Sequence, residues 1–237
     1  IAGSFTNWNG DAAQDYIAQY NGSIWAALGT SPFSAIDLIG DPHGLIIDSS
    51  DVLYTGSQSN DAGTSAKLRK WDGSTWTTLV ATANGATQAI QALCLGANGV
   101  IYFGGLFTAL TPTGGSAVSA NGVAAYNGTT VSALGAGISG GAAYVYGITC
   151  NAKGELLVGG AFTIAGDLTL SDGFAGWNGF TWFRPDIDFS GGPVVSDMIE
   201  LFGNLYVGYQ SAGTPALASG LTTATNGGST AAYPRLS

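Results

Sequence analysis

Short apolar stretches recur along the whole chain, and tight turns rich in Gly and Asn separate them. Residues 90–95 and 145–150 are two such stretches, and turns at Asn98-Gly99 and Lys153-Gly154 follow them. Apolar runs of this length between turn residues indicate β-strands. No apolar run reaches the roughly 18 residues that span a bilayer, and no basic start followed by an apolar stretch marks a signal peptide. The pattern predicts an all-β chain.

An aromatic residue followed by Asn or Asp and then Gly recurs at nearly constant spacing. The copies are Tyr20-Asn21-Gly22, Trp71-Asp72-Gly73, Tyr126-Asn127-Gly128, Trp177-Asn178-Gly179 and the degraded Thr225-Asn226-Gly227. Their Asn or Asp positions are 51, 55, 51 and 48 residues apart. Asn-Gly and Asp-Gly tolerate the positive φ that a type I′ turn needs at both central residues. Each copy therefore predicts a two-residue hairpin turn.

A second motif, an apolar pair followed by Gly, runs in phase with the first. Its copies are Ile1-Ala2-Gly3, Tyr54-Thr55-Gly56, Tyr102-Phe103-Gly104, Leu157-Val158-Gly159 and Tyr206-Val207-Gly208. Two motifs sharing a period near 50 residues indicate propeller blades rather than a helical solenoid. The approximate repeats within a single domain are 1–29, 30–80, 81–135, 136–186 and 187–237.

Each repeat predicts four antiparallel strands, which we call a, b, c and d. In the third repeat they cover residues 90–95, 100–103, 123–126 and 130–134. The chain starts in strand b of the first repeat, so we predict a five-bladed β-propeller whose first blade lacks strand a within residues 1–237. Closure then needs chain before Ile1 or a three-stranded first blade, and a sixth blade outside these residues is the remaining alternative.

Aromatic residues occupy fixed places in the repeat. Trp25, Trp76 and Trp182 come four residues after the Asn or Asp of the turn, and Val131 holds that place in the third copy. We expect these rings to pack blade on blade, since burying one such side chain is worth about 1.5–3 kcal/mol. Stacking on a sugar is the alternative role.

Copies such as residues 157–163 followed by residues 174–179 resemble the kelch-type repeats of galactose-oxidase-like propellers. They are closer still to repeats of bacterial surface proteins and phage structural proteins, which carry G-G-x-F-T and I-A-x-W-D-G. The resemblance covers nearly the whole chain and implies a blade architecture, a virion or cell surface as the location, and no particular chemistry. The fifth copy departs most, with Thr225 in the aromatic position.

The composition of the chain narrows the classes of molecule that it could bind. Charged residues make up only 9% of the chain, and six basic against 15 acidic residues give a net charge of −9. Phosphate-backbone binding needs clustered Lys and Arg, and the one basic cluster is Lys67, Arg69 and Lys70. We therefore expect neither nucleic acid nor a membrane as a partner.

Long, irregular connections place the candidate binding site. The b–c and d–a connections lie on one face of a propeller and carry the long loops, whereas the other face carries tight turns. Function is usually grafted on such loops. The candidate contacts on this long-loop face are Trp8, Asp11, Phe33, Tyr144, Phe189 and Tyr209.

Catalytic and metal chemistry find little support in the sequence. A Ser-His-Asp or Cys-His mechanism needs a histidine, and His43, the single one, lies in a polar turn. A five-bladed glycoside hydrolase is the enzymatic alternative, with Asp37, Asp48 and Glu200 as its inner carboxylates. Residues 48–51 and 10–15 are weak Ca²⁺ candidates. We expect no enzyme and no cofactor.

The two cysteines lie on strand a of successive repeats but at different offsets. Cys94 is five residues before Gly99, whereas Cys150 is four before Gly154. One residue of offset turns a side chain to the other face of its sheet, so we expect buried free thiols rather than a disulfide.

The function that these features favour is a non-enzymatic recognition or structural module on a virion or bacterial cell surface. It would contact a receptor, a glycan or a neighbouring subunit through its long-loop face. A propeller lectin with one sugar site per blade is the other alternative, and it predicts equivalent pockets at equivalent repeat positions.

Overall fold

A computed structural model describes residues 1–3, 5–11, 14–29, 43–58, 65–82, 88–170, 173–187, 194–201, 204–210, 219–225 and 230–232. Within these residues the secondary structure is almost entirely antiparallel strand, and the helical element is the three-residue turn η1 (Trp8–Gly10). The predicted all-β class is confirmed. No helix in the described ranges is long and apolar enough to cross a membrane.

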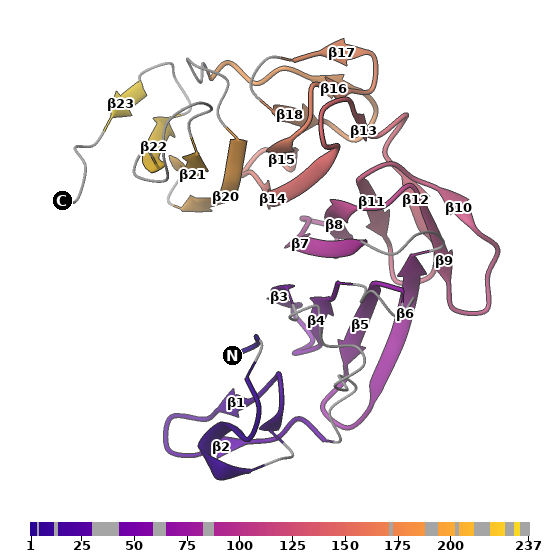
Figure 1. The fold of residues 1–237 in the computed structure, drawn as a ribbon, viewed down its shortest axis with the longest axis vertical. Helices are drawn as coiled ribbons and strands as arrows, with labels where there is room; N and C mark the ends of the chain where they lie inside the picture. Colours follow the sequence, from indigo (N-terminus) through magenta and orange to yellow (C-terminus); the bar gives the residue numbers. More distant parts are fainter. Residues whose placement is uncertain are drawn as a thin grey trace. The chain divides into compact units, whose positions relative to one another are not determined.

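Repeats two to five each form an antiparallel meander in the order a, b, c, d (Figure 1). The second contains β3 (His43–Ile47), β4 (Leu53–Gly56), β5 (Lys67–Trp71) and β6 (Trp76–Thr82). The third contains β7 (Ala89–Leu95), β8 (Ile101–Leu106), β11 (Val123–Tyr126) and β12 (Val131–Ala133). The fourth contains β14 (Tyr144–Cys150), β15 (Leu156–Ala161), β18 (Phe174–Trp177) and β19 (Trp182–Phe183). The fifth contains β20 (Val194–Leu201), β21 (Asn204–Gln210), β22 (Ser219–Thr225) and β23 (Thr230–Ala232).

The first repeat is shorter. A bridge joins Ala2 to Ile17, and the hairpin β1 (Gln19–Tyr20) and β2 (Trp25–Ala26) follows. These elements correspond to strands b, c and d, as the sequence predicted. No strand a of the first repeat lies among the described residues.

Three of the connections expected to be irregular loops contain additional strands. β9 (Ala109–Pro112) and β10 (Val118–Ser119) form a hairpin that extends the second sheet through pairs of β9 with β6. β16 (Ile164–Ala165) and β17 (Leu168–Thr169) form another, which pairs with β13 (Ile138–Ser139). The expectation of irregular loops was wrong here, because strands of two to four residues are too short to show an alternating pattern in the sequence.

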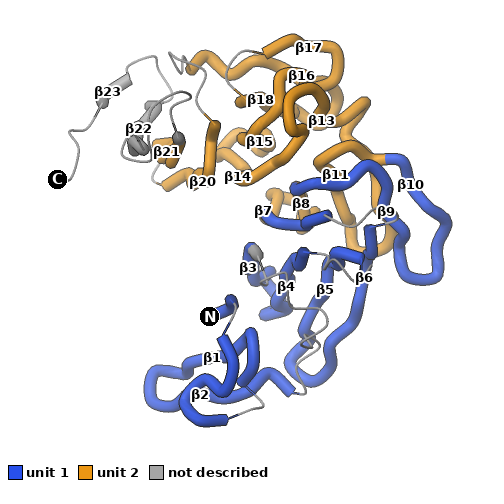
Figure 2. Tube along the Cα trace, in the orientation of Figure 1, with its two compact units in different colours: residues 1–93, 105–119 blue, residues 94–104, 120–237 orange. Residues whose placement is uncertain are grey.

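The chain divides into two compact units (Figure 2). Residues 1–93 and 105–119 form the first unit, and residues 94–104 and 120–237 form the second. The first unit contains the sheet from β3 to β10, and the second contains the sheets built around β14 and β20.

The hairpin turns between strands c and d differ from the predicted type I′. Gly22, Gly73, Gly128 and Gly179 have φ between 93° and 97°, whereas the preceding Asn or Asp has a negative φ. The side chain of Asn21 instead accepts hydrogen bonds from the N–H groups of Ser23 and Ile24, both at 3.0 Å. A type I′ turn needs a positive φ at both central residues, and here the glycine alone has one. The Asn is held by its own side-chain hydrogen bonds, as in an Asx turn.

Close approach between successive repeats explains the glycine of the second motif. A Cβ on Gly56 would overlap the backbone of Ile90 in strand a of the next repeat. A Cβ on Gly104 would lie 2.6 Å from Val145 Cγ1, and one on Gly159 would overlap Val195. Val145 and Val195 are fully buried. Strand a of the third, fourth and fifth repeats therefore packs directly on strand b of the preceding repeat, at the position where a side chain is missing.

Hydrogen bonds from tryptophan side chains also join successive repeats. Trp76 Nε1 donates to the Leu28 carbonyl, and Trp182 Nε1 donates to the Leu134 carbonyl, both at 2.8 Å and both across 48 residues. In the third copy, the side chain of Val131 has no N–H to donate. The carbonyl of Leu79, which holds the position of Leu28 and Leu134, instead accepts the backbone N–H of Thr113, just after β9, at 2.9 Å. The rings at these positions thus have a structural role between repeats, as predicted.

Replacing Trp182 by Phe should lower the free energy of unfolding by about 1–3 kcal/mol, because the buried Leu134 carbonyl loses its donor. Trp25→Phe is the matched control, since the indole N–H of Trp25 has no acceptor among the described residues. Urea unfolding followed by fluorescence measures both variants. Equal losses for the two would contradict a role for the hydrogen bond.

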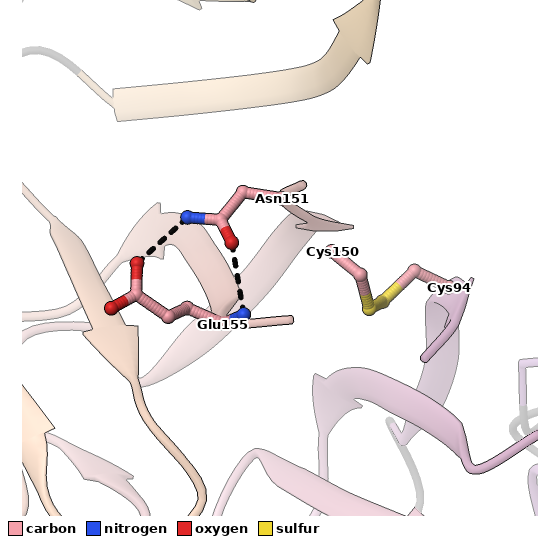
Figure 3. Close-up of a disulfide and its surroundings, with 4 residues drawn as sticks. All are labelled: Cys94, Cys150, Asn151 and Glu155. Carbon is pink, nitrogen blue, oxygen red and sulfur yellow. Dashed lines mark hydrogen bonds between the residues drawn. A yellow bond between two sulfur atoms is a disulfide. The ribbon is translucent and has the colours of Figure 1, made fainter. Parts of the chain in front are cut away.

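Cys94 and Cys150 form a disulfide within the second unit (Figure 3). Their Cα atoms are 6.2 Å apart, within the usual range for this bond. The expectation of free thiols was wrong. The one-residue offset does turn the two side chains to opposite faces of their own sheets, but opposite faces are the ones that meet when sheets stack. Directly after Cys150, Asn151 closes the next turn through hydrogen bonds with Glu155 at 2.8 and 2.9 Å.

Candidate binding loop

The b–c connection of the first repeat, residues 5–16, contains two of the predicted contact residues, Trp8 and Asp11. The N–H groups of Gly10 and Asp11 donate to the carbonyls of Asn7 and Trp8 at 2.8 and 3.1 Å, which makes η1. Asn7, Asn9 and Tyr16 have positive φ values of 51°, 54° and 68°. Asn adopts this conformation readily, whereas it is costly for Tyr16, and strained residues cluster at functional sites. We call residues 5–11 and 14–16 the binding loop.

Four aromatic rings form a continuous row beside this loop. The ring centroids of Phe5 and Trp8 are 5.0 Å apart, those of Trp8 and Trp25 5.2 Å, and those of Trp25 and Tyr20 5.0 Å. Tyr20 at the end of the row is 54% exposed, and its hydroxyl donates to the Gly22 carbonyl. The row is half-buried at one end and open to solvent at the other.

Polar groups in the binding loop complement the aromatic row. Asp11 is exposed, and one of its carboxylate oxygens accepts a hydrogen bond from Gln14 Nε2 at 3.1 Å. Gln14 is buried at 4% exposure, and its Oε1 has no hydrogen-bond partner in the described part of the chain. The buried Nε1 of Trp8 also has none. The loop thus supplies an exposed carboxylate held by a buried amide, together with the aromatic row, and such groups can bind a polar ligand that also has an apolar surface.

The other predicted contact residues lie elsewhere. Tyr144 is in β14, strand a of the fourth repeat, and Tyr209 is in β21, strand b of the fifth, where it pairs with Val195. Both are strand residues, whereas the sequence placed them with the loops. Phe33 and Phe189 lie outside the described residues. Of the six, Trp8 and Asp11 belong to one loop, where the Asp11 N–H donates to the Trp8 carbonyl.

Tyr144 stacks on Tyr146, with ring centroids 4.5 Å apart and planes at 12°. Burial of the ring, and then the neighbouring Tyr146, raises the pKa of Tyr144 to about 12. In the unfolded chain a tyrosine titrates near 10, so its contribution to stability is complete below pH 10 and is lost as the pH rises towards 12. We expect an absorbance titration at 295 nm to show a late tyrosine step that Tyr144→Phe removes. The same titration curve for both proteins would contradict this assignment.

The carboxylates of the glycosidase alternative are held in structural hydrogen bonds. Asp48 accepts from the N–H groups of Ser50 and Val52 at 2.8 and 3.1 Å and from the Tyr54 hydroxyl at 3.1 Å. Although partial desolvation acts to raise the pKa of Asp48, these hydrogen bonds and the charge of Lys70 lower it overall. A general acid needs a raised pKa. Glu200 accepts the Ala152 N–H at 3.0 Å, and Asp37 lies outside the described residues.

The Ca²⁺ candidates gain no support from side-chain geometry. Asp48 and Asp51 belong to a tight turn in which Asp48 is already an acceptor, and Asp51 has a φ of 60°. Across the described part of the chain, no three carboxylate, histidine or cysteine side chains come close enough to hold a metal ion.

Sequence reasoning missed three residues of interest. Phe5 and Gln14 gave no signal, because neither stands in a repeated position. Phe180 did give one, since it occupies the turn position that Ser23, Ser74 and Thr129 hold in the other copies. Its side chain is 88% exposed in the turn between β18 and β19.

No protein-family model and no curated protein matches the chain. Among solved structures, PorZ, an essential bacterial surface component of the type-IX secretion system of Porphyromonas gingivalis, is similar with a TM-score of 0.52 and 17% identity. The match covers 88% of this chain but only 28% of PorZ. The extracellular domain of the putative hybrid two-component system BT4673 from B. thetaiotaomicron matches with a TM-score of 0.40, 11% identity, and coverage of 79% of this chain and 27% of that one. At these identities the likeness to PorZ concerns the fold alone, and it agrees with the all-β architecture.

Proposed function

We propose that the chain is a non-enzymatic recognition module of the extracellular space, and that it binds a glycan through the binding loop. The aromatic row that ends in the exposed Tyr20, with Asp11 beside it in the loop, carries this proposal. Aromatic faces stack on the apolar side of a pyranose ring, while Asp11 accepts hydrogen bonds from its hydroxyl groups. A virion or a bacterial cell surface is the location that the repeat resemblance favours.

The disulfide supports an extracellular location. Disulfides persist in oxidising compartments and are rare in the cytosol, and the Cys94–Cys150 bond joins strands of two successive repeats. PorZ is described as a bacterial surface component. A scaffold of antiparallel repeats, which we propose to be a five-bladed propeller, would present the binding loop at the end of its strands.

The repeated tryptophans give less support to a lectin with one site in every blade. Trp177 and Trp182 are buried at 8% and 7% exposure, and the indole N–H groups of Trp76 and Trp182 already have acceptors. The equivalent positions of the first repeat, Tyr20 and Trp25, instead belong to the aromatic row. A single site at the first repeat is the arrangement that we propose.

A glycan array probed with the labelled chain tests this proposal, and isothermal titration with the best glycan measures its affinity. We expect Tyr20→Ala and Asp11→Asn each to weaken binding at least tenfold. Tyr126→Ala is the matched control, because Tyr126 lies before an identical turn and donates to the Gly128 carbonyl as Tyr20 does to Gly22. An array without hits, or equal affinities for Tyr20→Ala and Tyr126→Ala, would overturn the proposal.

A further inference from the structure

Acidic side chains set the charge of the first repeat. Residues 1–29 contain Asp11 and Asp15 but no lysine or arginine. Asp11 is exposed and Asp15 is half-buried. The first basic residues along the chain, Lys67 and Arg69, belong to β5 of the second repeat, and Arg69 is buried at 3% exposure. A glycan with carboxylate or sulfate groups would meet like charge at the binding loop, which is unfavourable.

Hydrogen bonds hold both acidic residues to the backbone at Trp8. The Asp11 N–H donates to the Trp8 carbonyl at 3.1 Å, and Asp15 Oδ1 accepts the N–H of Asn7. Trp8 belongs to the aromatic row, with its ring centroid 5.0 Å from that of Phe5. The binding loop therefore joins two negative charges to the aromatic row at one residue.

The amide of Gln14 adds an acceptor for which the described part of the chain supplies no donor. Gln14 Nε2 donates to Asp11 Oδ2 at 3.1 Å, and Oε1 is bonded to the same amide carbon, so it lies beside this carboxylate. A buried acceptor without a donor costs free energy. An ammonium group has three N–H donors and no acceptor. It therefore complements a place where a carboxylate and an amide oxygen lie together.

Aromatic faces attract the same kind of group. A cation within about 6 Å of the centroid of a Trp or Tyr ring is attracted by the ring quadrupole. Phe5, Trp8 and Trp25 are half-buried and Tyr20 is 54% exposed, so the aromatic row presents ring surface to a ligand. The rings and the carboxylates of the first repeat thus favour a ligand of the same charge.

We propose that the glycan of the binding loop is cationic, with free amino groups on its hexosamine residues. This inference rests on the proposed glycan site and specifies its ligand. The apolar face of the pyranose ring stacks on the aromatic row, while an ammonium group donates hydrogen bonds to Asp11 and is attracted by the charge of Asp15. N-acetylation removes the positive charge and therefore lowers the affinity, although the sugar ring stays the same.

The probes are two oligomers of the same length and linkage, one of glucosamine and one of N-acetylglucosamine. In isothermal titration we expect the glucosamine oligomer to bind about tenfold more tightly, the size of effect that a cation–π contact and an exposed ion pair give together. High ionic strength should reduce this ratio of affinities, because salt screens exposed charges. Asp11→Asn and Asp15→Asn should each lower the ratio at least threefold.

Asp72→Asn is the matched control. Asp72 is an exposed carboxylate in the same unit, and Asn holds its place in the turns of the first, third and fourth repeats. This variant removes one negative charge outside the binding loop and should leave the ratio unchanged. Tetralysine controls for a general attraction of polycations to a chain with a net charge of −9. It has no pyranose ring and should bind at least tenfold more weakly than the glucosamine oligomer.

The outcomes separate this inference from the proposed function. Equal affinities for the two oligomers, or tighter binding of the N-acetylated one, would overturn the inference and leave the glycan site in place. A ratio that Asp72→Asn lowers as much as Asp15→Asn, or tetralysine that binds as tightly as the glucosamine oligomer, would overturn it as well, because the attraction would then be general. If neither oligomer binds and the glycan array gives no hits, the proposed function fails and the inference fails with it.

Discussion

Replacing both cysteines by serine should lower the free energy of unfolding by about 4 kcal/mol. The disulfide closes a loop with a sequence separation of 56 residues, and the loss of chain entropy in the unfolded state for a loop of this size is worth about 4 kcal/mol. For a chain of this length, that loss corresponds to a decrease in Tm of roughly 8–16 °C. Calorimetry of the wild type and of the double variant, Cys94→Ser with Cys150→Ser, measures it.

The reduced wild-type protein is the control for this prediction. Dithiothreitol should lower the Tm of the wild type to that of the double variant and leave the variant unchanged. A double variant as stable as the oxidised wild type would show that the bond does not constrain the unfolded chain.

The second large effect is expected at Gly159, where alanine should lower the free energy of unfolding by about 1–3 kcal/mol. The new methyl group would overlap Val195 and come within contact of Met198 in strand a of the next repeat, and both belong to a buried cluster. Because Gly159 is in β15 with an ordinary strand φ, the loss would come from packing alone.

Gly208→Ala provides the matched control. Gly208 holds the same place in the fifth repeat, but among the described residues a Cβ there would meet only the Asp197 carbonyl oxygen at 3.8 Å, an ordinary contact. Its effect on urea unfolding should stay within about 0.5 kcal/mol. A cost for Gly208→Ala equal to that for Gly159→Ala would mean that the glycine is required for a reason other than the packing of the next repeat.

The strands could be predicted because their signals are local. Residues 123–126 were predicted as a strand with the bounds that the structure gives. In this strand, apolar residues end at an aromatic residue directly before an Asn-Gly turn, so pattern and turn chemistry agree. Strand a was predicted within one residue at its start in the third and fourth repeats.

Contacts between repeats could not be predicted in the same way. The disulfide was missed because the offset of the cysteines was compared within one sheet, whereas the bond depends on which faces of two sheets meet. The glycine motif was visible, but its cause lies in residues about 35–40 positions away, such as Val195 for Gly159. The connection that contains Trp8 and Asp11 was singled out from its length, whereas the neighbours of Trp8 in the aromatic row depend on the tertiary fold.

The proposal of one closed five-bladed ring can be tested most directly by the radius of gyration in solution. A compact domain of 237 residues should have a radius of gyration of about 18 Å. Small-angle X-ray scattering of the monomer should give this value together with a pair-distance distribution that has a single maximum. A markedly larger radius with an extended tail would contradict the closed ring and favour an open row of repeats.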